Sequence, residues 1–427
     1  MERFDGLVWS LDLQPKPINL PGMTDPSLWQ GRDFRLFIGA SAFAHLAYGI
    51  NAVAFPWLAT LLTRDPMLIG MVTMAPILPW LFFALPAGVL TDRLDHRQAI
   101  IWANVIRAAL ILGTFGLALT ATPGTGAVWL LAALAFAQGT VEVLRDNTAQ
   151  TILPQVVDKP QLEEANAVLM TSENLMSQFL GPPVAGAMIA LSIALPFGVE
   201  AAALVGSAVL VALMATRAAA RPARQPFLPA MREGLAWLWG HLALRRLGLV
   251  LGAYNFLFQL IWSLMVLYAQ DSLRLGSFGY GVLLSSLALG GLVGGVAAPW
   301  ILRRLGVRRG LLMSVAGFSL STGVLVFTDN PWIAGAALFG DAFTSMTWNV
   351  ATVTYRQRHI PAPLLGRVNA AYRFLGSAPR PFAPLLGGAL VALGAPLGSW
   401  ALHLPFAVAT VGGVFLLIYC ARRLHLD

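Results

Sequence analysis

The segment Gly88-Val-Leu-Thr-Asp-Arg-Leu-Asp-His-Arg97 is a short charged stretch between two long apolar runs, at about 66–90 and 98–120. Each run exceeds the roughly 20 residues that a helix needs to cross the hydrocarbon core of a membrane. A related segment, Arg303-Arg-Leu-Gly-Val-Arg308, stands between two further apolar runs. A charged turn between spanning helices that recurs after about 200 residues predicts two related halves.

The composition of the whole chain places it in a membrane. Its 427 residues are 57% hydrophobic and 11% charged, with a mean hydropathy of +0.70, whereas soluble domains carry about 25% charged residues. The single cysteine, Cys420, excludes an internal disulfide and a cysteine metal cluster. We expect no metal and no cofactor. Residues 1–32 lack an apolar run of signal-peptide length and predict a cytoplasmic tail.

The apolar runs predict an all-α integral membrane protein of about twelve transmembrane helices, because no alternating strand pattern of a membrane β-barrel occurs. The expected spans are 34–62, 66–90, 98–120, 127–150, 163–191, 197–217, 246–270, 278–302, 309–328, 331–355, 366–393 and 399–421.

The basic residues predict the orientation of these spans. Of 28 Lys and Arg residues, all but four fall on the side that carries both termini. Arg64 and Arg274 fall on the opposite side, and Arg107 and Arg380 lie inside spans. Because basic loops stay in the cytoplasm, we expect both termini there and the chain in the cell (inner) membrane. The net charge of +8 is therefore a topology signal and does not indicate nucleic-acid binding.

The two halves define the expected domains. Asn166-Ala corresponds to Asn369-Ala, and Gly181-Pro-Pro-Val-Ala-Gly186 corresponds to Pro384-Leu-Leu-Gly-Gly388. Two six-helix repeats imply a substrate site between the halves near mid-membrane, which works by rocking. The expected parts are a tail (1–33), a six-helix bundle (34–217), a cytoplasmic linker with an amphipathic helix (218–245), a second bundle (246–421) and a C-terminal tail (422–427).

The segment 88–97 resembles the motif between helices two and three of the major facilitator superfamily. It departs from that motif at Asp95, where glycine is usual, and at His96, where Arg or Lys is usual. Its Asp-Arg-Leu-Asp form is similar to the enterobactin-exporter-like, or transmembrane secretion effector, branch of drug and siderophore exporters. Arg145-Asp-Asn-Thr-Ala-Gln-Thr-Ile-Leu-Pro154 and Leu365-Gly-Arg-Val-Asn369 resemble that branch too. The resemblance covers almost everything after about residue 34.

The resemblance implies a cytoplasmic gate and a packing motif. Gly88 permits close helix approach, and Asp92 faces the positive N-terminus of a neighbouring helix. Arg93 and Arg97 are expected to pair with Asp146 on span four. The alternative is a solvated loop that sets topology only. In span five, the group Gly181, Pro182 and Gly186 resembles the antiporter motif of exporters, which bends and thins the helix.

Ionisable residues inside spans are costly and mark function by default. Arg107 and Glu142 are expected to form a structural pair. Glu173 and Asp341 are the main candidates for proton or cation binding, with His45 beside them. Arg380 either receives an anionic substrate group or neutralises Asp341. The span-four arginine of the superfamily motif is replaced by Ala135, which directs proton coupling elsewhere. Apolar cavity surface, or ordinary packing, is expected from Trp262 and Trp348.

These observations favour a monomeric secondary transporter, most simply a proton-driven exporter of amphipathic small molecules. An uptake symporter or a lysolipid flippase on the same fold is the first alternative. A membrane receptor or an integral-membrane enzyme is a more remote one. An enzyme is disfavoured because the sequence has no metal-ligand cluster, nucleophile elbow or phosphate loop. The expected partners are the substrate, protons and the lipid bilayer.

The charge asymmetry makes a topology prediction. Tags at residue 5, within 220–228 and at residue 427 should all be cytoplasmic, because basic loops are retained there. Protease or thiol-reagent access to any of these tags from outside intact cells would contradict the orientation.

Overall fold

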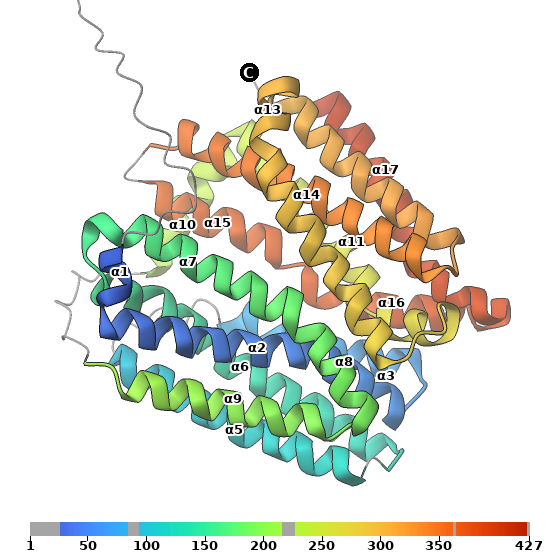
Figure 1. The fold of residues 1–427 in the computed structure, drawn as a ribbon. Coiled ribbons are helices and arrows are strands. Elements are labelled where there is room, and N and C mark those ends of the chain that lie inside the picture. The colour runs from blue at the N-terminus through green and yellow to red at the C-terminus, as the bar shows by residue number, and fades with distance from the viewer. Residues whose placement is uncertain (1–25, 84–93, 121, 216–226, 362–363, 425–427) are drawn as a thin grey trace, which may run out of the picture.

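The computed structural model describes residues 26–83, 94–120, 122–215, 227–361 and 364–424, which are helical with short connections and contain no strand. The first bundle follows a short helix α1 (Pro26–Gln30) (Figure 1). Its helices are α2 (Arg32–Leu62), α3 (Pro66–Met74), α5 (His96–Thr120), α6 (Thr125–Val156), α7 (Leu162–Asn174), α8 (Gly181–Leu191) and α9 (Leu195–Ala212).

The second bundle lies beside the first in Figure 1. Its helices are α10 (Phe227–Gly240), α11 (Leu242–Trp262), α12 (Met265–Leu267), α13 (Ser277–Phe327), α14 (Pro331–His359), α15 (Leu365–Ser377), α16 (Ala383–Leu393) and α17 (Leu404–Arg423). Tighter or wider helical turns connect several of them: η1 (Lys159–Gln161), η2 (Leu175–Leu180), η3 (Tyr268–Ser272), η5 (Arg380–Phe382) and η6 (Ala395–His403).

The all-α membrane class is confirmed by the length and hydropathy of these helices. Seven described helices are long and apolar enough to cross a membrane, and an eighth span results if the bent pair Leu242–Trp262 and Met265–Ser272 counts as one. One of the seven, α13, has 51 residues and leaves helical geometry at Gly306, whose φ is +76°. It therefore contains two of the expected spans, and the total of twelve stays a prediction.

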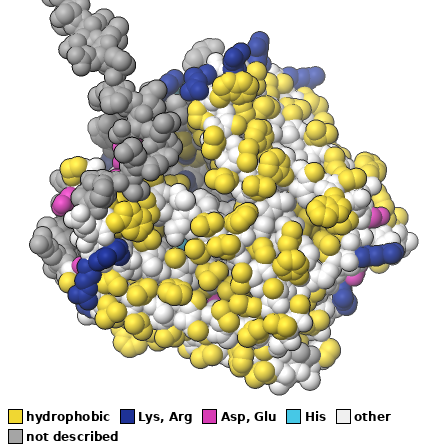
Figure 2. Space-filling model, in the orientation of Figure 1, with side chains coloured by type: hydrophobic (Ala, Val, Ile, Leu, Met, Phe, Trp, Pro, Cys, Tyr) yellow, Lys and Arg dark blue, Asp and Glu magenta, His cyan; other side chains and the backbone are white. Residues whose placement is uncertain are grey.

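The surface of the bundles is apolar, as a surface in contact with lipid requires. Figure 2 shows hydrophobic side chains over most of the visible face, with charged groups gathered toward its edges. Large exposed side chains on this kind of surface include Leu292, Leu320, Phe327 and Phe415. In water such contiguous apolar area would be costly, so the fold is built for a bilayer.

The two charged turns predicted to correspond make the same contact in each half. Arg97 donates from Nε to the backbone oxygen of Val211 at 3.2 Å and also contacts Ala212, at the end of α9. Arg308 donates to the backbone oxygens of Ala421 and Leu424, at 2.7 and 3.1 Å, at the end of α17. A cation on the unpaired carbonyls of a helix C-terminus is favourable. The repeat inferred from sequence thus has a structural counterpart.

The two bundles touch through backbone contacts at glycine. A Cβ atom added to Gly186 of α8 would lie 2.4 Å from the backbone oxygen of Ser277, where α13 begins. The related contact joins α3 to α16, where a Cβ on Gly70 would lie 2.4 Å from the backbone oxygen of Pro384. Only glycine permits helices to approach this closely.

Hydrogen bonds join the same ends of the two bundles. Arg64, after α2, bonds to Gln270 and Asp271 at 2.9 and 3.4 Å. Ser277 donates to the backbone oxygen of Gly186 at 2.8 Å. Because this end carries the two basic residues assigned to the outside, the structure has its predicted outer end closed.

The close backbone contact at Gly186 predicts that one added methyl group will weaken the closure of the outer end. Gly186→Ala should weaken the closed outer end, because the new Cβ would overlap the backbone of Ser277. Overpacking of this kind costs about 1–3 kcal/mol, so the ratio of open to closed molecules should rise roughly fivefold or more. Spin labels at Leu191 and Leu393, which lie exposed at this end of different bundles, should report a larger population of long distances.

The matched control is Gly295→Ala on α13, where an added Cβ has nothing within 4 Å. It should leave the distance distribution unchanged. Identical distributions for Gly186→Ala and Gly295→Ala would contradict the role of the glycine contact in closure.

Candidate functional site

The first cluster of polar side chains lies inside the first bundle. Arg107 on α5 is 3% exposed, and its guanidinium lies 3.9 Å from the carboxylate of Glu142 on α6. Gln138, one turn before Glu142, accepts from Arg107 Nε at 3.4 Å and donates to the backbone oxygen of Arg107 at 3.1 Å. The structure therefore brings together the two residues expected to pair, and adds an amide that holds the arginine from two sides.

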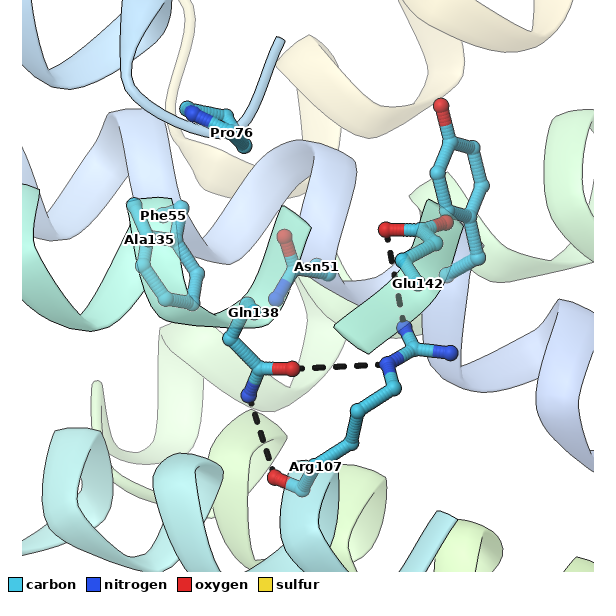
Figure 3. Close-up of a pocket in the computed structure, with 8 residues that line it drawn as sticks. Asn51, Phe55, Pro76, Arg107, Ala135, Gln138 and Glu142 are labelled. Atoms are coloured by element: carbon cyan, nitrogen blue, oxygen red, sulfur yellow. Dashed lines mark hydrogen bonds and ion pairs between the residues drawn. The ribbon is translucent and has the colours of Figure 1, made fainter. Parts of the chain in front are cut away.

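A small cavity adjoins this cluster. Its volume is about 20 Å³, which is room for about one water molecule. Figure 3 shows that Arg107 reaches it from α5, while Ala135 forms part of the wall on α6. Arg107 of span three and Ala135 of span four therefore line the same cavity. The remaining lining residues are Tyr48, Asn51, Phe55, Pro76, Gln138 and Glu142.

A buried acid that the sequence analysis missed lies next to this cavity. Glu200 on α9 is fully buried, and the side-chain amide of Asn51 on α2 donates to its two oxygens at 3.0 and 3.2 Å. Glu200 lies near the start of α9, at the edge of the apolar run expected as span six. The available signal was that it is the only acidic residue of the apolar run 197–217.

Two candidates for proton binding meet on the side of the first bundle that carries α7. His45 Nε2 on α2 lies 4.0 Å from the Glu173 carboxylate, whose side chain is 52% exposed. Glu173 precedes the wide turn η2 and the packing motif that starts at Gly181. Wide helical turns of this kind occur often at functional sites.

The gate expected at the charged turn is only partly visible. Gly88, Asp92 and Arg93 lie outside the described residues. Asp146 pairs with its neighbour Arg145 at 2.9 Å, while Arg97 binds the end of α9. The expected pairing of Arg97 with Asp146 is therefore wrong for this conformation, because the carbonyls at the helix end occupy the guanidinium.

The second bundle holds a separate, smaller site. Asp341 on α14 is 4% exposed and accepts a hydrogen bond from the hydroxyl of Tyr254 on α11 at 3.3 Å. Arg380 in η5 donates to Gln259 at 3.4 Å. The ion pair between Asp341 and Arg380 that the sequence left open is not formed in the described part of the chain. Each group has a neutral partner instead.

The two aromatic candidates, Trp348 and Trp262, differ in how deeply they are buried. Trp348 is almost fully buried and lies parallel to Tyr254, with 6.2 Å between ring centroids. It packs against Tyr254, the hydrogen-bond partner of Asp341, which fits the packing alternative, and a contact with substrate stays a prediction. Trp262 is only partly buried and lies 5.8 Å from Phe258.

The chemistry available at these sites is proton and charge exchange. The described residues hold no group of three or more His, Cys, Asp or Glu side chains that suits a metal ion. What they offer is carboxyl groups inside apolar bundles, with one guanidinium in each bundle close to an amide. Such groups mark ion or proton pathways in membrane proteins.

The buried pair predicts a non-additive loss of stability. Arg107→Ala and Glu142→Ala should each lower the melting temperature of the purified protein, because each strands a buried charge at a cost of about 3–5 kcal/mol. The double variant should lose less than the sum of the two, since it strands neither charge.

The control cycle uses Arg64 and Asp271, a pair whose side chains are 59% and 47% exposed. Its coupling should be within about 1 kcal/mol of zero. Additive losses for Arg107 and Glu142 would show that the two groups do not depend on one another.

Comparison with known proteins identifies the fold and the family. The multidrug efflux pump Tap of Mycolicibacterium fortuitum is 28% identical over 394 residues, which cover 89% of this chain and 95% of Tap. The enterobactin exporter EntS of Escherichia coli O1:K1 / APEC is 25% identical over 394 residues, covering 90% and 89%. The crystal structure of the nucleoside transporter NupG superposes with a TM-score of 0.72 at 12% identity, covering 91% of this chain and all of NupG.

The family is settled by a match over most of the chain. Residues 37–384 match the Major Facilitator Superfamily model, and this range includes the Arg107 cluster, Glu200 and Asp341. It also includes both charged turns that bind helix ends. The chain is therefore a multi-pass membrane protein that belongs to the Major Facilitator Superfamily.

Proposed function

We propose that this protein is a secondary transporter that exports amphipathic small molecules in exchange for protons. The named activities of two full-length relatives, a multidrug efflux pump and an enterobactin exporter, support export. The observation that carries the coupling part is the placement of carboxyl groups inside the bundles, with Asp341 buried against a phenol and Glu173 beside an imidazole.

Asp341 has the surroundings of a group that binds a proton reversibly. A buried carboxylate without a cation costs several kcal/mol, whereas the neutral acid does not. Tyr254 donates one hydrogen bond to it, which holds the side chain in place but supplies no full charge. Approach of a cation, from the substrate or from Arg380, would favour release of the proton.

Glu173 suits the other half of an exchange cycle. Its side chain is half exposed, so it is accessible from outside the bundle, and the His45 imidazole lies 4.0 Å from its carboxylate, within reach of an ion pair when His45 is protonated. We expect the two acids to act in different steps, because they lie in different bundles that rock against one another.

The proposed substrates carry an apolar body and a polar or charged group. Partly buried aromatic side chains, Trp57, Phe258 and Trp262, offer apolar contact. Arg380, whose hydrogen-bond partner among the described residues is the Gln259 amide, offers a cation for an anionic group. No enzymatic step and no cofactor other than the proton gradient is proposed, and the protein is expected to act as a monomer in the cell membrane.

The decisive test is transport by purified protein in liposomes with an imposed pH gradient. Dyes, siderophores and lysolipids should be screened, with substrate movement opposite to proton flow as the expected result. Transport that ignores the pH gradient, or that moves substrate in the direction of the protons, would contradict proton-driven export.

The coupling residues make a sharper prediction. Glu173→Gln and Asp341→Asn should abolish pH-driven transport in at least one of the two variants, because each removes a protonatable group at nearly constant shape. Exchange of substrate without a gradient should stay largely intact. Glu163→Gln, the same change at an exposed residue of α7, is the control. Full pH dependence in both variants would place the coupling site elsewhere.

A further inference from the structure

A second protonatable site lies in the first bundle, away from Glu173 and Asp341. Glu200 is fully buried, and its hydrogen-bond partner among the described residues is the neutral amide of Asn51. We propose that Glu200 is a proton-binding group that exchanges its proton with Glu142 through water of the adjoining cavity, which Asn51 connects to Glu200. The inference rests on the proposed proton-driven function and adds a route for the proton to it.

The charge balance around Glu200 requires a proton. The helices packed against α9 are α2, α5 and α8. The ionisable groups that line the cavity beside Asn51 are Tyr48 of α2, Arg107 of α5 and Glu142 of α6, and α8 has no ionisable residue. The Arg107 guanidinium lies 3.9 Å from Glu142, whereas the hydrogen bonds and ion pairs of the described residues give Glu200 no cation. Glu200 must therefore be neutral to avoid an unpaired buried charge.

Asn51 stands between the two acids. It donates to Glu200 and lines the cavity that Arg107, Gln138 and Glu142 also line, as Figure 3 shows for these four. The cavity has room for about one water molecule, and its amide and carboxylate groups give such a water several partners. Because the Asn51 amide donates to Glu200 and cannot accept its proton, transfer needs this water to take the place of the amide at Glu200.

The proposed step moves one proton and changes no bond order elsewhere. When the Asn51 amide turns aside, Glu200 in its acid form gives its proton to the cavity water, and that water passes a proton to the carboxylate of Glu142. The negative charge moves to Glu200, and the total charge of the cluster is unchanged. Arg107, held by Gln138 on two sides, then lies between a neutral acid and a more distant carboxylate.

An aromatic pair covers Glu200 on the side of the predicted outer end. Phe55 and Phe197 lie one helical turn from Asn51 and Glu200, toward the predicted outer end, and pack edge to face with 5.7 Å between centroids. Both are buried, at 6% and 0% exposure. They separate Glu200 from the outer water in this conformation. The proton on Glu200 therefore exchanges through the cavity, and outer access requires this pair to part.

The first test measures the proton directly. Infrared spectra of the purified protein at neutral pH should contain a carboxylic-acid C=O band that is lost in Glu200→Gln and kept in Glu163→Gln. The amide replaces the acid at nearly the same shape, so Glu200→Gln should keep the elution volume and melting temperature of a folded protein. If that variant does not fold, a shift of the band in Glu200→Asp serves instead. No band that depends on residue 200 at any pH would overturn the proposal.

The second test separates this inference from the proposed function. In liposomes, Glu200→Gln should slow pH-driven transport at least tenfold while exchange without a gradient continues. Asn51→Leu should keep the infrared band but slow pH-driven transport, because the acid remains and its connection is lost. Absence of pH-driven transport in the unmodified protein would contradict the proposed function. Normal pH-driven transport in Glu200→Gln, or a requirement for a sodium gradient, would contradict the role of Glu200.

Discussion

The cost of an unpaired charge in an apolar interior determines how this protein is organised. A buried ion that loses its partner costs several kcal/mol, so ionisable groups inside the bundles are held by amides, phenols or opposite charges. Arg107 is fixed by Gln138 and Glu142, Asp341 by Tyr254, and Glu200 by Asn51. These partners come from different helices. Under the proposed function, relative movement of these helices would change the protonation of the acids, which is the property that a coupled carrier needs.

The glycine contacts between the bundles give the molecule a defined closed state. At Gly186 and Gly70 the backbones of opposite bundles touch, without side chains that adjust to small displacements. Such packing is either made or broken, since close-packed surfaces do not deform continuously. Together with the hydrogen bonds of Arg64, the contacts hold one end of the molecule shut.

The sequence predicted the membrane class, the repeat and the family, because these depend on long apolar runs and on recurring charged turns. It also predicted that Arg107 and Glu142 lie close together, since both are isolated charges at a similar depth. It did not predict that His45 meets Glu173, that Arg97 binds the end of α9, or that Glu200 is buried against Asn51. Those contacts depend on how each helix is rotated about its axis. The hydropathy of a run does not specify that rotation.

The two arginines at the helix ends have a mechanical consequence. Arg97 ties the start of α5 to the end of α9, and Arg308 ties the part of α13 beyond Gly306 to the end of α17. Each arginine joins two helices of the same bundle at their charged ends. It therefore resists sliding between those two ends, so that a rotation of the bundle at one face of the membrane is carried along both helices to the other face.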